Sequence, residues 1–213
     1  MKCIAIIPIK KRSTRVKNKN FKRLRKKKLY QYFIDKIKKC NFDEIYVDSD
    51  SIEIKRYCEK NRVKFIERKK SLSKDTANGN DLMNYHFKLV KADYYFQLFV
   101  TAPLLSVKTI NKCIKILKKT KKYDSILTSH EIYSWFWFKN KPINYSPKVL
   151  PRSQDAKPIT VETTGLYGIT YPALKKNKCR IGKKPFFLNV SKKEALDLDT
   201  DDDFKILEKV YKL

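Results

Sequence analysis

Short apolar runs alternate, over the first part of the chain, with segments whose apolar residues recur every three or four positions. The short β-branched runs predict buried strands at residues 3–9, 43–50, 63–68, 93–100 and 124–131. The helical spacing predicts amphipathic helices at residues 29–40, 51–61, 79–91 and 106–120. This alternation is typical of right-handed βαβ units, so we expect an α/β fold with a mostly parallel sheet.

The pattern changes after residue 131. Residues 131–160 are aromatic and punctuated by proline, without a helical period. We expect them to form an arm or hairpin inserted into a single domain that spans residues 1–213, and to contact a second copy of the chain. Trp135 and Trp137 fit packing or interface contacts there, with sugar stacking as the alternative. Further strands are expected at residues 162–174 and 185–190, and a last helix at residues 201–212.

Ligands of open α/β sheets bind at the carboxyl ends of the strands. That rule selects the loops at 8–20, 68–80, 101–106 and 197–200. The first loop contains six cations: Lys10, Lys11, Arg12, Arg15, Lys17 and Lys19. Backbone amides at a strand-to-helix turn, backed by cations, suit a phosphate group. A solvated basic loop is the alternative on composition alone.

Five carboxylates are crowded near the end of the sequence: Asp197, Asp199, Asp201, Asp202 and Asp203. Asp197 and Asp199 are two positions apart, and at the end of a strand this spacing sends both side chains to one side. Two such carboxylates beside a triphosphate are the usual minimum for Mg²⁺. The other three would fill the first turn of a helix capped by Thr200, where the helix dipole favours negative charge. The alternative is that all five carboxylates only stabilise the start of the helix and bind no metal.

The chain is strongly basic, with 50 Lys and Arg against 22 Asp and Glu and a formal net charge of +28. The excess is diffuse outside residues 10–28, so we favour a solvated lysine-rich surface over nucleic-acid binding. No run reaches the roughly 18 apolar residues of a membrane span. The five cysteines include no C-x-x-C pair, which argues against a zinc ribbon and for reduced thiols in the cytoplasm. Of the remaining candidates, we expect Cys58, Cys113 and His86 to be packed core residues.

The basic loop resembles the opening I-P-A-R-G-G-S-K-R-x-x-x-K-N of the acylneuraminate cytidylyltransferases, which activate sialic acids and other nonulosonates with CTP. The matching residues are Ile7, Pro8, Ser13, Arg15, Lys19 and Asn20, while Lys11 and Arg12 replace the glycine pair. The resemblance implies that Lys10, Ser13, Arg15, Lys19 and Asn20 contact the nucleotide, chiefly its phosphates. Residues 13–15 are also similar to a sister group of transferases in spore-coat polysaccharide synthesis.

Other segments resemble the same family in the same order. Residues 68–77 resemble its nucleotide segment, which implies that Arg68 and Asp75 shape the base and ribose pocket. Thr101 falls in the segment that borders the sugar. A later run resembles the sugar-side wall at Arg152, Gln154, Asp155, Glu162, Thr164 and Tyr167. The sequence LDLDT, at 196–200, is similar to the D-I-D-T metal motif.

The resemblance implies a Rossmann-like, three-layer nucleotidyltransferase that works as a homodimer. A hydroxyl of an acidic sugar would attack the α-phosphorus of CTP, forming a CMP-sugar and releasing pyrophosphate. Lys19, Arg15 and Asp199 would be catalytic, and Asp197 and Asp199 would hold Mg²⁺. This requires Lys19 and Asp199 to face each other across a cleft. The alternatives are a polyanion-binding or nucleic-acid-binding protein of the same fold without catalysis, and a related enzyme that uses another nucleotide or sugar.

Overall fold

The computed structural model describes residues 1–13 and 16–212, and its centre is a seven-stranded sheet of order β11-β7-β10-β6-β1-β4-β5. The strands are β1 (Cys3–Ile9), β4 (Glu44–Ser49), β5 (Lys64–Glu67), β6 (Tyr94–Leu98), β7 (Ser125–Ile132), β10 (Ile159–Thr170) and β11 (Pro185–Asn189). The helices are α1 (Leu29–Ile37), α2 (Ile52–Lys60), α3 (Gly79–Leu89), α4 (Val107–Lys119), α5 (Tyr171–Asn177) and α6 (Asp201–Lys212). Two short ribbons pair β2 (Arg23–Leu24) with β3 (Lys27–Lys28) and β8 (Trp137–Phe138) with β9 (Lys141–Pro142).

The sheet is mostly parallel, as predicted. Strand β1 pairs in parallel with β4 and β6, β4 with β5, and β7 with β11. Strand β10 runs antiparallel to both of its neighbours, β6 and β7. The carboxyl ends of β1, β4, β5 and β6 therefore share one edge of the sheet.

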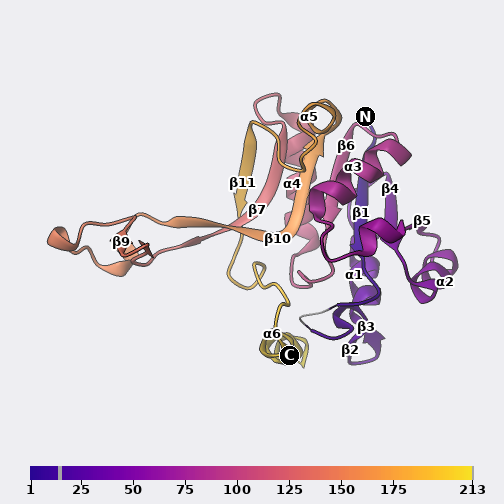
Figure 1. Cartoon of the computed structure of the whole chain (residues 1–213), viewed down its shortest axis with the longest axis horizontal. Coiled ribbons are helices and arrows are strands. Elements are labelled where there is room, and N and C mark those ends of the chain that lie inside the picture. Colours follow the sequence, from indigo (N-terminus) through magenta and orange to yellow (C-terminus); the bar gives the residue numbers. More distant parts are fainter. Residues whose placement is uncertain (14–15, 213) are drawn as a thin grey trace.

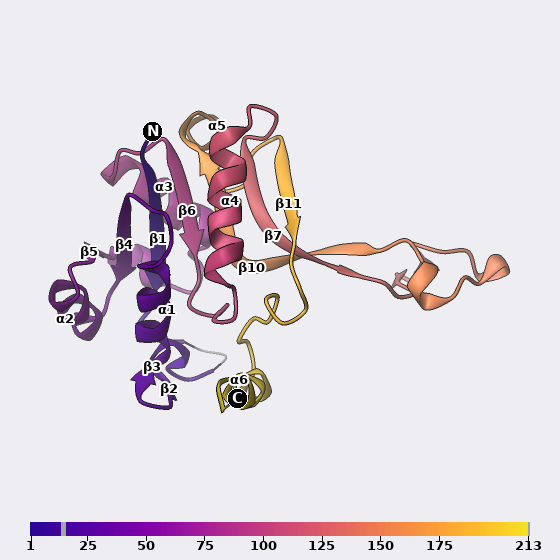
Figure 2. The same ribbon diagram turned by 180° about the vertical axis from the view of Figure 1, so that it is seen from behind.

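The sheet is covered on both faces, which explains the continuous apolar run of β1. Successive strand residues point to opposite faces. Ala5 and Ile7 pack in the core that includes residues of α1 and α4, whereas Ile4 and Ile6 pack in a second core with residues of α3 and α5. Helices α3 and α5 lie before the sheet in Figure 1, and α1 and α4 lie before it in the reverse view of Figure 2. The predicted three-layer α/β fold is confirmed.

The chain between β7 and β10 leaves the body as a long arm that carries the β8–β9 ribbon (Figures 1 and 2). The buried side chain of Asn144 fastens its two branches together, accepting from the Phe136 amide at 2.8 Å and donating to the Lys157 carbonyl at 2.7 Å. Large apolar side chains on the arm are exposed, among them Trp137 at 56% and Phe138 at 62%. A role of the arm in dimerisation stays a prediction.

Two predictions about local structure were wrong. The strand expected at 162–174 ends at Thr170, and Tyr171 begins helix α5, because Pro172 lacks an amide hydrogen and fits the first helical turn. Asp197 and Asp199 were expected at the end of a strand. Strand β11 ends at Asn189, and the aspartates lie in irregular chain beyond it, where the two-residue alternation does not apply.

The remaining expectations about packing agree with the structure. All five cysteines are free thiols, and Cys58 and Cys113 are fully buried. His86 is also fully buried, on the inner side of α3. Among the helices in the described part of the chain, none has the length and apolar character needed to cross a membrane.

Candidate active site

The loop after β1 is fixed to the loop after β5. The Lys10 ammonium lies 2.5 Å from the Asp75 carboxylate. Asn20, which is 8% exposed, donates from its side-chain amide to the Lys10 carbonyl at 3.1 Å. The Lys11 amide donates to Asp50, directly after β4, at 2.7 Å. Three predicted nucleotide-binding residues thus lie together at the carboxyl edge of the sheet.

Lys19 joins this loop to the chain that precedes α6. Its Nζ lies 3.1 Å from Asp199 Oδ1 and also donates to the Leu198 carbonyl oxygen. The Leu198 amide in turn donates to the carbonyl of Thr101, in the loop after β6, at 2.9 Å. The four loops selected from the sequence therefore converge. Lys19 and Asp199 touch directly, rather than facing each other across an open cleft.

Asp197 has the environment of a cation ligand. Its Oδ1 atom is buried and has no hydrogen-bond partner among the residues that the structure describes. An unpaired buried carboxylate oxygen is costly unless a cation compensates it. No group of three or more His, Cys, Asp and Glu that could hold a metal occurs in the described residues. Among the acidic side chains of the described residues, Asp197 and Asp199 are therefore the candidates for a metal here, and the other ligands would be groups of another kind.

The other acidic residues of this region begin helix α6, as the sequence predicts. The Asp203 amide donates to the Thr200 hydroxyl oxygen at 3.2 Å, and the Asp203 carboxylate accepts from the Thr200 amide at 2.7 Å. This reciprocal pair is a capping box. Asp201 and Asp202 occupy the same first turn. The three aspartates are thereby accounted for without a metal.

A buried polar trio includes Arg68, one of the residues predicted to bind the nucleotide. Asp48, the fifth residue of β4, is fully buried and accepts from the Nε atom of Arg68. Its other carboxylate oxygen lies 2.7 Å from His86 Nε2. A buried arginine has to be paired with an acid, so Asp48 fixes where the Arg68 guanidinium lies.

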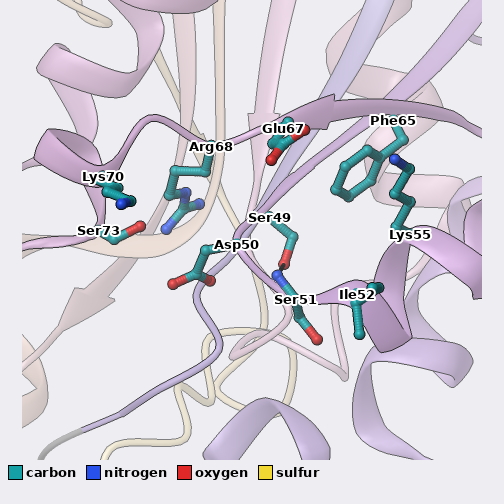
Figure 3. A pocket seen from close by; sticks show the side chains of 10 residues that line it. All are labelled: Ser49, Asp50, Ser51, Ile52, Lys55, Phe65, Glu67, Arg68, Lys70 and Ser73. Carbon is teal, nitrogen blue, oxygen red and sulfur yellow. Dashed lines mark hydrogen bonds between the residues drawn. The ribbon is translucent and has the colours of Figure 1, made fainter.

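The Arg68 side chain borders a cavity of about 480 Å³ between the ends of β4 and β5 (Figure 3). Ten residues line it: Ser49, Asp50, Ser51, Ile52, Lys55, Phe65, Glu67, Arg68, Lys70 and Ser73. The lining therefore includes hydroxyl groups, acidic and basic side chains, and one aromatic ring. A cavity of this size suits a ligand such as a nucleoside.

The residues predicted to border the sugar are centred on Tyr167. This buried side chain donates its hydroxyl to the Glu162 carboxylate, and burial together with that hydrogen bond raises the pKa of Tyr167. Arg180 covers the ring, with its Cζ 3.6 Å from the ring centroid. Thr164, from the same strand as Tyr167, is exposed.

Some predicted site residues are not brought to this centre. Arg152 and Gln154 are exposed on the arm segment, where Arg152 pairs with Asp155 at 2.7 Å. Ser13 is half-buried in the loop after β1. Arg15 lies outside the described residues.

Asp48 and Arg180 were missed as functional candidates. Asp48 lies within a strand, and its partner His86 is 38 positions away, so the sequence shows no local signal for the pair. Arg180 is one more cation in a lysine-rich stretch.

Comparisons with known proteins agree on one group. Residues 4–150 match the model of the family described as cytidylyltransferase. A curated relative from Helicobacter pylori, the bifunctional pseudaminic acid cytidylyltransferase and UDP-2,4-diacetamido-2,4,6-trideoxy-beta-L-altropyranose hydrolase, is 26% identical over 208 residues. That alignment covers 93% of this chain and 40% of the relative. The chain thus spans less than half the length of the relative.

Solved structures share the fold. CMP:2-keto-3-deoxy-manno-octonic acid synthetase, in complex with CTP, superposes with a TM-score of 0.72 at 15% identity, covering 100% of this chain and 99% of that one. The 4-diphosphocytidyl-2C-methyl-D-erythritol synthase of Anaerococcus prevotii gives a TM-score of 0.71 at 12% identity, covering 100% and 97%. At these identities the likeness shows the fold.

Proposed function

The chain belongs to the cytidylyltransferase family, and from that premise we propose that it transfers CMP from CTP to a hydroxyl of an acidic, nonulosonate-type sugar, releasing pyrophosphate. The curated relative, whose name includes pseudaminic acid cytidylyltransferase, supports this substrate class. The observation that carries the proposal is the convergence of the Lys19 ammonium with the Asp199 carboxylate and the Leu198 carbonyl. That contact supports the proposal because it joins the candidate phosphate ligand Lys19 to the candidate metal ligand Asp199.

Nucleotidyl transfer depends mainly on positioning and charge neutralisation. Lys10 and Lys19 would bind the triphosphate, together with Arg15, and would stabilise the charge that develops on pyrophosphate. Lys19 is 8% exposed and is held by a backbone carbonyl, so its ammonium is oriented before substrate arrives. A bound triphosphate would replace the Asp199 contact of Lys19 with phosphate oxygens.

Asp197 and Asp199 would hold Mg²⁺. The buried, unpartnered Oδ1 of Asp197 supports this role. The ion would supply charge neutralisation at the phosphate oxygens and lower the pKa of the attacking hydroxyl. The small number of protein ligands suits Mg²⁺, which keeps several waters and takes oxygen ligands from phosphate.

The remaining predicted residues would divide between nucleotide and sugar. Arg68, fixed by Asp48, would face the nucleoside in the cavity of Figure 3. Tyr167, Glu162 and Thr101 would border the sugar.

The arm would mediate a homodimer, because its exposed apolar side chains offer a surface for a second copy. Arg152 and Gln154 would then act only in the assembled dimer. A cytoplasmic location is also part of the proposal, supported by the five free thiols.

The test is a pyrophosphate-release screen of the four ribonucleoside triphosphates against a panel of nonulosonates that includes pseudaminic acid. We expect release with CTP, Mg²⁺ and at least one acidic sugar, and its loss in Asp199→Asn. Release with a neutral sugar alone, or with another nucleotide alone, would redirect the proposal to a related enzyme.

The formal charge of +28 supports one second candidate, a polyanion-binding protein of this fold. Such a protein would bind heparin or DNA with a steep salt dependence and would be indifferent to Asp199→Asn. The same variant therefore separates the two functions.

A further inference from the structure

Arg180 occupies a defined position over the sugar side of the site. It follows helix α5 and precedes β11, and its side chain is 21% exposed. The guanidinium Cζ lies 3.6 Å from the centroid of the Tyr167 ring and 5.8 Å from that of Phe99. Stacking on an aromatic face holds the guanidinium plane while its edge remains able to donate hydrogen bonds.

The surrounding chain is shaped to hold this side chain. The Arg180 amide donates to Asn80 Oδ1 at 2.9 Å, and Nη1 donates to Gln97 Oε1 at 3.4 Å. Residue 79, at the start of α3, is glycine, and a Cβ there would lie 2.3 Å from Arg180 Nη1. The arginine is therefore pre-organised rather than free to move in solvent.

In the described part of the chain, the acidic partner of Arg180 is Glu162, and the ion pair between them is long. Nη2 lies 3.6 Å from Glu162 Oε1, beyond hydrogen-bond distance. The same Glu162 oxygen already accepts the Tyr167 hydroxyl. A fixed guanidinium whose acidic partner lies beyond hydrogen-bond distance is well suited to a planar anion such as a carboxylate, which accepts two parallel N–H bonds.

The position of Arg180 also agrees with the chemistry of the proposed substrate. In a nonulosonate the carboxylate is attached to the anomeric carbon, which also carries the attacking hydroxyl. A group that binds this carboxylate must therefore lie near the metal end of the site. Tyr167 pairs with Gln97 of β6, and Thr101, which follows that strand, accepts from the amide of Leu198 at 2.9 Å, so the ring under Arg180 lies towards that end.

We propose that Arg180 binds the carboxylate of the acidic sugar and makes the enzyme select acidic over neutral sugars. This rests on the proposed function. The competing explanation is that Arg180 only pins the α5–β11 connection onto Tyr167.

The experiment compares wild type, Arg180→Met and Arg180→Lys on the acidic sugar that passes the pyrophosphate screen and on its methyl ester. We expect Arg180→Met to lower kcat/KM for the acid by about 10- to 150-fold, the range of a charge-assisted hydrogen bond, with little change for the ester. Arg180→Lys should recover part of the loss. Arg56→Met, which removes an exposed arginine from α2, is the matched control and should leave both substrates unchanged. Equal losses for acid and ester would overturn the inference in favour of the pinning role.

The two proposals fail in different ways. If wild type releases no pyrophosphate with any acidic sugar, the proposed function is wrong. In that case binding of N-acetylneuraminate and of its methyl ester to wild type and Arg180→Met is measured by ligand-observed NMR. If wild type binds the acid and Arg180→Met does not, the proposed carboxylate site at Arg180 is supported. If binding of the acid does not depend on Arg180, that site is overturned as well.

Discussion

Lys19 and Asp199 are 180 positions apart in sequence and in direct contact in space, with 3.1 Å between Nζ and Oδ1. The contact ties the loop after β1 to the chain before α6. It joins the two sequence motifs on which the account depends, the basic loop and the aspartate pair.

Lys19→Met should lower kcat/KM for CTP by roughly 100- to 1,000-fold, the usual effect of removing one electrostatic contact to a transition state. Lys22→Met is the control, because Lys22 pairs with Asp201 at the start of α6, outside the predicted site. Steady-state pyrophosphate release measures both variants. Equal activities of the two would contradict the role of Lys19.

Asp48→Ala should destabilise the protein by about 3–5 kcal/mol, because it leaves the buried Arg68 charge without a partner. Both side chains are nearly inaccessible, with exposed fractions of 3% for Arg68 and 0% for Asp48. Urea unfolding measures the change in the free energy of unfolding. The control Asp155→Ala breaks an exposed pair with Arg152 and should cost less than about 1 kcal/mol. A similar small cost for Asp48→Ala would show that the trio is not strongly coupled.

The free energy of unfolding should fall as the pH rises above 9. Burial raises the pKa of Cys113 from 9.0 to about 12, so above pH 9 the unfolded chain loses this proton while the folded chain keeps it. Each such thiol contributes a slope of up to ~1.4 kcal/mol per pH unit. Cys113→Ala should therefore show a shallower decline than wild type between pH 9 and 11 in denaturant titrations. Parallel declines would contradict the assignment.

The titration of Lys36 should have the opposite effect on the pH dependence of the free energy of unfolding. Burial lowers the pKa of Lys36 from 10.5 to about 8, while its Nζ donates to the Leu105 carbonyl at 2.8 Å. Between pH 8 and 10.5 the unfolded chain binds the proton that the folded chain has released, so this residue alone makes stability rise with pH. Lys36→Met should remove that rise, giving a steeper decline than wild type over the same range. An unchanged slope would contradict the shift.

The double variant Trp137→Ser, Phe138→Ser should reduce dimer formation, because the two side chains are among the exposed apolar groups of the arm. Light scattering coupled to size-exclusion chromatography measures the molar mass. Ile52→Ser is the matched control, since Ile52 is 67% exposed on α2, away from the arm. A wild-type protein that is monomeric at all concentrations would refute the dimer.

The sequence predicted the fold well where the pattern of apolar residues is set by burial. Strand β1 is apolar throughout because helices cover both faces of the sheet, and α4 shows its buried side through Ile110 and Leu117. The pattern failed where a local rule competed with it. Residues 171–174 were expected to be strand although Pro172 favours a helix start, and β10 cannot be recognised as antiparallel from its own residues.

The arrangement of the candidate site followed from the sequence only in part, for a similar reason. Lys10, Lys19, Asp75 and Asp199 belong to loops that the carboxyl-edge rule selects, and the structure brings them together. Asp48 and Arg180 contact partners far away in sequence, with separations of 38 residues to His86 and 83 to Gln97. Such contacts are created by the packing of the sheet and its helices, so they cannot be predicted from the spacing of residues along the chain.

The most direct test of the central claim, that the basic loop and the aspartate pair form one magnesium–nucleotide site, is calorimetric titration of CTP in the presence and absence of Mg²⁺. We expect Mg²⁺ to tighten CTP binding to wild type, Asp197→Asn to abolish this tightening, and Lys19→Met to weaken binding in both conditions. Tightening by Mg²⁺ that is equal in wild type and Asp197→Asn would contradict the central claim.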